Sequence, residues 1–268
     1  MYPLKRFVPS RFALPGLLLA VVLTASLSSC NEQTESAAKK LQEAALGSAV
    51  DLAENQLPSD ATVLTSDEQK ALTPEAVLAE LKAGNQRFVD NNPTRRDYAK
   101  QVKAAAAGQY PKAVVISCLD SRVPVEDLFD QSIGDLFVGR VAGNFVDEDF
   151  LGSMEFACKV AGAKAIVVMG HQHCGAVKGA IDNVKLGNLT AMLAKIQPAV
   201  TRAASGFSGE RTAKNDAFVQ RTAEENVRYG IEQIRANSPI LKGMEDNGEI
   251  KIVGAFYSLD TGAVTVLN

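Results

Sequence analysis

The stretch AVVISCLDSR, residues 113–122, decides the fold of this 268-residue chain. It begins with four apolar residues, three of them β-branched, which is the pattern of a strand buried on both faces of a parallel sheet. Similar short runs occur at 136–138 and 165–169. Helical patterns lie between them around 150–160, and after them around 189–204 and 214–236. Strands that alternate with helices predict an α/β domain, in which helices flank a central, mainly parallel sheet.

A helix is predicted to open this domain as an N-terminal helical arm, and a hairpin to close it. In Thr73-Pro74-Glu75 the threonine can cap a helix, the proline suits its first position, and the glutamate favours its positive end. Residues 250–257 and 264–267 are strand-like, and a turn sequence, Asp-Thr-Gly, lies between them. We therefore expect an antiparallel hairpin at one edge of the sheet.

The composition excludes several classes of function. A net charge of −3 argues against nucleic acid as a partner, and four Cys are too few for a disulfide scaffold of this length. The histidines are His171 and His173, so a metal site with three His ligands from one chain is excluded. Among the cysteines, Cys158 lies in a helical apolar pattern and is predicted to be a buried, unreactive thiol.

Two short segments that follow predicted strands carry residues suited to chemistry. Cys118, Asp120 and Arg122 follow the first strand, and His171 and Cys174 follow the third. Because sites collect at the carboxyl ends of parallel strands, we expect the two segments to meet. Two Cys and one His leave the fourth position of a tetrahedral Zn²⁺ open, as in catalytic zinc sites. Asp120 could bind the zinc at that position, or Arg122 could pair with the Asp120 carboxylate and hold it away from the metal. A structural disulfide between Cys118 and Cys174 is the alternative.

The paired segments resemble the motifs of the β-class carbonic anhydrases, which hydrate CO₂ reversibly to bicarbonate and a proton. The motifs are Cys-x-Asp-Ser-Arg at 118–122 and Gly-His-x-x-Cys-Gly at 170–175. The resemblance extends to 139–144 and 83–88, and it covers roughly 70–268. It implies a zinc enzyme in which zinc-bound hydroxide attacks CO₂. It assigns zinc binding to Cys118, His171 and Cys174, a catalytic pair to Asp120 and Arg122, and a substrate contact to Gln109.

Several properties of the family stay open for this chain. Some relatives hydrolyse CS₂ or COS on the same fold, and a non-catalytic zinc-binding surface lipoprotein is a further alternative. The resemblance implies a homodimer or homotetramer with the active site at a subunit interface. It also favours packing of the helix around Val77 to Phe88 on a partner, where burial in its own core is the alternative. Regulation by a second bicarbonate site is in doubt, because Val115 stands where that site has a Trp. His173 is either a proton relay or a solvent-facing residue.

Residues 1–29 are predicted to be a bacterial lipoprotein signal peptide. Basic residues precede an apolar stretch that ends at Leu27-Ser28-Ser29-Cys30, in the order typical of a secretory signal. The last four residues resemble a lipobox, which implies that Cys30 carries lipid; an uncleaved anchor or a chance Cys is the alternative. We then expect a tether over 30–68 and a carbonic anhydrase domain over 69–268. The lipid would hold the exported protein at the outer membrane, facing the periplasm or the cell surface.

Overall fold

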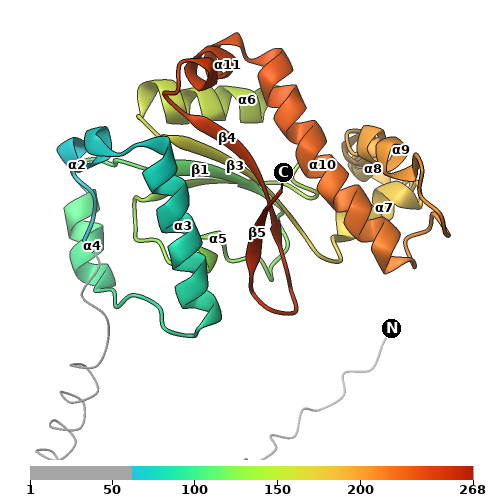
Figure 1. Cartoon of the computed structure of the whole chain (residues 1–268), viewed down its shortest axis with the longest axis horizontal. Coiled ribbons are helices and arrows are strands. Elements are labelled where there is room, and N and C mark those ends of the chain that lie inside the picture. The colour runs from blue at the N-terminus through green and yellow to red at the C-terminus, as the bar shows by residue number, and fades with distance from the viewer. Residues whose placement is uncertain (1–61, 268) are drawn as a thin grey trace, which may run out of the picture. The chain divides into compact units, whose positions relative to one another are not determined.

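The computed structural model describes residues 62–267, which form a five-stranded sheet flanked by helices (Figure 1). The strand order is β2-β1-β3-β4-β5, the first four strands are parallel, and β5 runs antiparallel to β4. The strands are β1 Ala113–Ser117, β2 Leu136–Arg140, β3 Ala165–His171, β4 Lys251–Tyr257 and β5 Val264–Leu267. This architecture confirms the predicted α/β fold, including the antiparallel hairpin at one edge.

The helices cover both faces of the sheet (Figure 1). They are α2 Ser66–Ala71, α3 Pro74–Val89, α4 Tyr98–Ala105, α5 Val125–Leu128, α6 Glu148–Glu155, the π-helical η1 Phe156–Val160, α7 Gly175–Ile181, α8 Gly187–Ala194, α9 Gln197–Ala204, α10 Asp216–Asn237 and α11 Pro239–Asp246. Alternate residues of β1 point to opposite faces, as the period of a strand requires. Val114 and Ile116 pack in the same cluster as residues of α6, α10 and α11, whereas Val115 packs with residues of α3 and α5.

Two predicted helical stretches differ in detail from the observed ones. The stretch expected around 189–204 is two helices, because Pro198 lacks an N–H and its ring clashes with the carbonyl four residues earlier, where α8 ends. The stretch around 150–160 changes from α-helix to a π-helical turn, in which Ala161 N–H donates to Phe156 O at 2.9 Å. The spacing of apolar residues predicts neither the break between α8 and α9 nor the π-helical turn.

The N-terminal helix α3 packs within its own chain. Thr73 caps it by accepting the N–H of Ala76 at 3.2 Å, as predicted. Its apolar residues Val77 and Leu81 are buried in the cluster that includes Val115 of β1. Burial of Val77 and Leu81 in the chain's own core is therefore observed, and packing of the helix on a partner stays a prediction.

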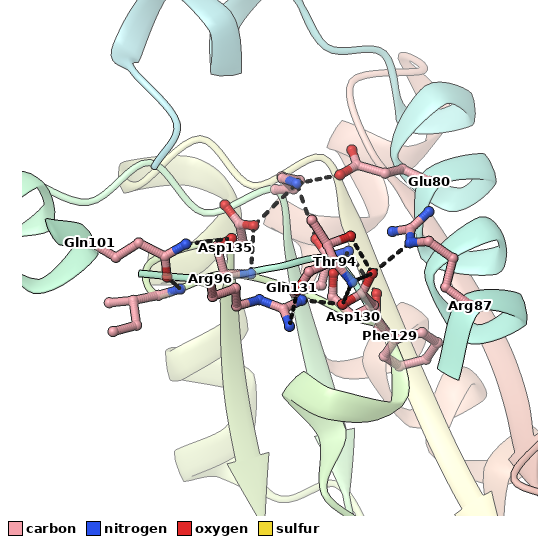
Figure 2. A network of polar contacts seen from close by, with 12 residues as sticks. Glu80, Arg87, Thr94, Arg96, Gln101, Phe129, Asp130, Gln131 and Asp135 are labelled. Atoms are coloured by element: carbon pink, nitrogen blue, oxygen red, sulfur yellow. Dashed lines mark hydrogen bonds and ion pairs between the residues drawn. The ribbon is translucent and has the colours of Figure 1, made fainter. Parts of the chain in front are cut away.

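A polar network fastens α3 and the segment after it to the amino end of the sheet (Figure 2). Its centre is Asp130, whose side chain is fully buried. The carboxylate accepts hydrogen bonds from Arg87 Nε at 2.5 Å, from Thr94 Oγ1 at 2.6 Å and from Arg96 Nη2. Burial alone would raise the pKa of Asp130, but these hydrogen bonds outweigh it and lower the pKa. Beside them, the buried Lys112 ammonium donates to Gln131 at 3.0 Å.

Close packing of α10 against the sheet positions the carboxyl edge of β3. Gly170 permits it, since a Cβ at this position would lie 2.9 Å from Val227 Cγ2 of α10. Helix α10 thereby reaches the edge at which β3 ends with His171.

The predicted leader, residues 1–29, and the lipidation residue Cys30 lie outside the described residues, as does most of the tether predicted over 30–68. Within 62–267, no helix has the length and apolar character needed to cross a membrane. Residues 66–71 form α2, and Gln69 at the predicted domain start is buried and donates to Pro111 O at 2.7 Å. The boundary at residue 69 stays a prediction.

Replacing Asp130 with Asn is expected to lower the free energy of unfolding by about 3–5 kcal/mol at neutral pH, because the buried Arg96 loses its counter-charge. The difference in unfolding free energy between the variant and the wild type should narrow as the pH falls below about 4, near the pKa of Asp in an unfolded chain. Because the pKa of Asp130 is lower in the folded state than in the unfolded state, its carboxylate stabilises the fold above that pH. This stabilisation is lost when the carboxylate becomes protonated. Urea unfolding across this pH range measures both effects.

The matched control is Asp246→Asn, which removes an exposed ion pair with Lys242. It should cost less than about 0.5 kcal/mol. Equal losses for the two variants would show that the Asp130 network contributes nothing special to the fold.

Candidate metal centre

Three soft or borderline metal ligands meet at the carboxyl edge of the sheet. Cys118 directly follows β1, His171 ends β3, and Cys174 is the residue before α7. Because β1 and β3 are parallel neighbours, their carboxyl ends lie side by side. The ligand atoms of the three residues all lie within 4.8 Å of one another, and all three side chains are buried.

The geometry of this cluster fits a tetrahedral zinc ion. The sulfurs of Cys118 and Cys174 are 3.9 Å apart, and Zn–S bonds of about 2.3 Å at a tetrahedral angle would separate two sulfurs by about 3.8 Å. His171 Nδ1 lies 2.8 Å from the carbonyl oxygen of Gln172, so Nδ1 carries the proton and donates. His171 Nε2 is buried without a hydrogen-bond partner, and its lone pair is left for a metal.

The two buried thiols also favour a cation. Hydrogen bonding with Cys174 lowers the pKa of the Cys118 thiol to about 4, against the opposing effect of burial, and the Gly143 N–H adds to the lowering. The same sulfur–sulfur hydrogen bond, together with burial, raises the pKa of Cys174. The pair thus keeps one proton between two sulfurs, and a divalent cation that binds both thiolates takes the place of that proton. Both cysteines are free thiols here, not the disulfide considered as the alternative.

Asp120 lies at the edge of the cluster and is held by Arg122. Its Oδ1 accepts from the N–H and Nε of Arg122 at 3.0 and 2.9 Å, and its Oδ2 accepts from Nη2 at 2.8 Å. This fork holds the pKa of the Asp120 carboxyl well below its usual range. Asp120 Oδ2 is 4.0 Å from His171 Nε2, so the carboxylate stays ionised next to the ligands while it accepts hydrogen bonds from Arg122.

Gln109 is the predicted site residue that the single chain does not bring to the cluster. It is exposed and precedes β1, whereas Cys118 follows that strand, so the two residues lie at opposite ends of β1. Its contact with substrate stays a prediction, and it requires a second copy of the chain.

His173, which the sequence left open, faces the surface. Its side chain is 39% exposed, and Nδ1 lies 3.3 Å from a carboxylate oxygen of Asp216, the first residue of α10. Cys158 is buried in the core, as predicted, and burial raises the pKa of its thiol to about 12.

Two residues outside the predicted set of site residues, Gln172 and Arg140, help to shape the site. Gln172 joins the ligand loop to the β4–β5 hairpin, since its Oε1 accepts from Ser258 Oγ at 3.1 Å. Arg140 donates to the carbonyl oxygens of Cys118 at 3.3 Å and Val123 at 2.5 Å, and so braces the loop that carries Asp120. Gln172 lies between two ligands in the sequence, which is the one signal that could have singled it out.

Replacing Cys118 with Ser is expected to weaken Zn²⁺ binding by more than about 100-fold. Loss of a residue that only hydrogen-bonds to a ligand lowers metal affinity by about 10- to 100-fold, and loss of the ligand itself should lower it further. Cys158→Ser is the matched control, since it changes a buried thiol that lies in another cluster. Competition with a chelator of known affinity measures both variants. Unchanged affinity in Cys118→Ser would show that the metal binds elsewhere.

Comparison with known proteins agrees with this site and fold. The family described as carbonic anhydrase matches residues 113–264. Carbonic anhydrase 2 of Mycobacterium tuberculosis is 39% identical over 193 residues, which cover 70% of this chain and 90% of the relative. The crystal structure of the β-carbonic anhydrase CafA of Aspergillus fumigatus is 27% identical, with a TM-score of 0.57 over 72% of this chain and 90% of that chain. A tetrameric β-carbonic anhydrase of Sordaria macrospora, 24% identical, shares the fold with a TM-score of 0.57 over 72% of this chain and 96% of its own. Taken with the Cys-His-Cys cluster, these matches show that the chain belongs to the β-carbonic anhydrase family.

Proposed function

We infer that this protein is a zinc-dependent carbonic anhydrase, which catalyses the reversible hydration of CO₂ to bicarbonate and a proton. The observation that carries the inference is the convergence of Cys118, His171 and Cys174 within 4.8 Å, with the ionised Asp120 beside them. A purely structural site has no use for the Asp120–Arg122 pair. Membership of the family indicates which reaction is catalysed, and the geometry of the cluster indicates which residues take part in it.

The chain's own residues prepare the site for attack on CO₂. Zinc, when bound, supplies a Lewis acid that makes water nucleophilic near neutral pH. Cys118, Cys174 and His171 Nε2 provide three ligands and leave room for a fourth, as catalytic zinc sites do. The three ligand residues are at most 4% exposed, whereas the Asp120 side chain beside them is 16% exposed.

Asp120 acts as the orienting base of the site. Its Oδ2 lies 4.0 Å from His171 Nε2, so with zinc held by the three ligands the carboxylate would be placed to accept a hydrogen bond from the reacting water and to orient it. Arg122 keeps the carboxylate ionised and fixes its orientation through two side-chain hydrogen bonds. The Arg122 side chain is 55% exposed, so the Asp120–Arg122 pair lies next to solvent.

Replacing Asp120 with Asn is expected to lower the CO₂ hydration rate by about 10²- to 10⁴-fold, because the amide cannot accept and orient as an ionised carboxylate does. Zinc should stay bound, since the three ligands are unchanged. Stopped-flow hydration on metal-quantified protein measures the rate, with the exposed Asp246→Asn as control. A normal rate with zinc bound would remove Asp120 from the mechanism.

We further propose that the active form is a homodimer or a homotetramer, in which Gln109 of one copy serves the site of another. The support is the position of Gln109 at the opposite end of β1 from Cys118. A solved structure of the same fold is also tetrameric. A site completed by a second subunit would let Gln109 touch substrate although it is remote from the cluster of its own chain.

Mixing two inactive variants tests this arrangement. A mixed dimer of Gln109→Ala and Asp120→Asn chains contains one site with both native residues if Gln109 acts across the interface. Random pairing makes half the dimers mixed, so about a quarter of wild-type activity should return. No recovery in a mixture that light scattering shows to be dimeric would contradict the shared site.

Export as a lipoprotein is the remaining part of the proposal. This part is supported by the sequence alone. Residues 1–30 have a basic start and an apolar stretch, and they end in Leu27-Ser28-Ser29-Cys30. Lipid on Cys30 would place the carbonic anhydrase domain at the outer membrane. The lipid would be its single attachment there.

Cys30→Ser is expected to abolish incorporation of a labelled fatty acid and to move the protein out of the membrane fraction, because the acyl chains are its anchor. Cell fractionation followed by immunoblotting measures this. Continued membrane attachment of Cys30→Ser would favour an uncleaved apolar anchor instead.

A further inference from the structure

The sulfur of Cys118 has a hydrogen-bond donor behind it. The Gly143 N–H, in the loop after β2, donates to Cys118 Sγ at 3.3 Å. Gly143 has a φ of +86°, and a Cβ there would lie 2.5 Å from Ile196 Cδ1. Glycine suits this position because L side chains rarely adopt this backbone angle, and a Cβ would also require Ile196 to shift.

A residue of α10 holds Gly143 from its other side. Asn226 Nδ2 donates to Gly143 O at 2.7 Å, and the Asn226 side chain is buried. The partner is a carbonyl oxygen, so the contacting atom is the amide nitrogen. Both backbone polar groups of Gly143 are thus engaged, the N–H by a metal-ligating sulfur and the C=O by Asn226.

Burial of Asn226 is difficult to explain by packing alone. The neighbouring residues Ala223 and Val227 are buried and apolar. Asn226 Oδ1 is buried without a partner in the described structure, which costs stability that an apolar side chain of similar size would not lose. The hydrogen bond from Asn226 Nδ2 to Gly143 O therefore explains why an amide side chain is buried at this position.

We propose that Asn226 is a positioning residue for the metal centre. By fixing Gly143, it holds the N–H against the Cys118 sulfur. A hydrogen bond to a ligating sulfur withdraws electron density from it, and so tunes the charge that the ligand gives to the metal. This role rests on the proposed zinc site, and it extends the site to a helix that carries none of the ligands.

The test uses the protein loaded with Co²⁺ in place of Zn²⁺, because the thiolate-to-cobalt absorption band reports the charge on the sulfurs. Asn226→Leu removes the donor at similar volume. It should shift this band and weaken Co²⁺ binding by about 10- to 100-fold. Thr222→Val is the matched control, since Thr222 is buried one turn earlier on α10 and donates only to Phe218 O within the helix.

Thr222→Val should match the wild type in both the band and the affinity. The same band and affinity in Asn226→Leu would overturn the role of Asn226. A wild-type chain that bound no Co²⁺ would instead contradict the metal site itself, so the two failures are distinguishable.

A second measurement needs no variant and holds even if Asn226→Leu does not fold. In wild-type protein loaded with ¹¹³Cd²⁺, the Gly143 amide proton should show a scalar coupling to the metal through the Cys118 sulfur. It should also exchange slowly with solvent. Absence of the coupling together with fast exchange would overturn the proposal.

Discussion

The parallel pairing of β1 with β3 is the constraint on which the metal site depends. Ile116 is in register with Val168, and both strands then run to the same edge, where Cys118 follows one and His171 ends the other. The core enforces this register, because a slip of one residue would turn Ile116 towards the opposite face. Hydrophobic packing on both faces of the sheet therefore fixes the distance between ligands that are far apart in sequence.

Electrostatics at that edge then determine what the site can do. Two buried thiols that hold one proton between them favour a divalent cation, and the free Nε2 of His171 completes a set of ligands that suits zinc. Arg122 keeps Asp120 ionised, so the cluster has a carboxylate beside it that stays available to orient water. The burial that makes the thiols dependent on a cation also strengthens each of these interactions.

The sequence predicts the parts of the structure that follow from local pattern. Buried strands such as 113–117, the cap at Thr73 and the closing hairpin each have a signature within a few residues. Ligand spacing and the strand-end position likewise predict that Cys118 and His171 meet.

Contacts between distant loops have no such signature. The bond from Arg87 to Asp130 spans 43 positions and that from Gly143 to Cys118 spans 25, and each depends on how separate elements pack. The burial of Val77 and Leu81 of α3 in the chain's own core could not be read from the sequence for the same reason, because an apolar stripe does not specify which surface covers it. Gln109 remains the predicted site residue that one chain does not bring to the cluster.

The CO₂ hydration rate, followed by stopped flow as zinc is added to the metal-free protein, tests the zinc-dependent mechanism most directly. The Cys118–His171–Cys174 site predicts a rate that rises in proportion to bound zinc and levels off at one ion per chain. A rate no higher than that of buffer with every chain loaded, or full activity without metal, would contradict it.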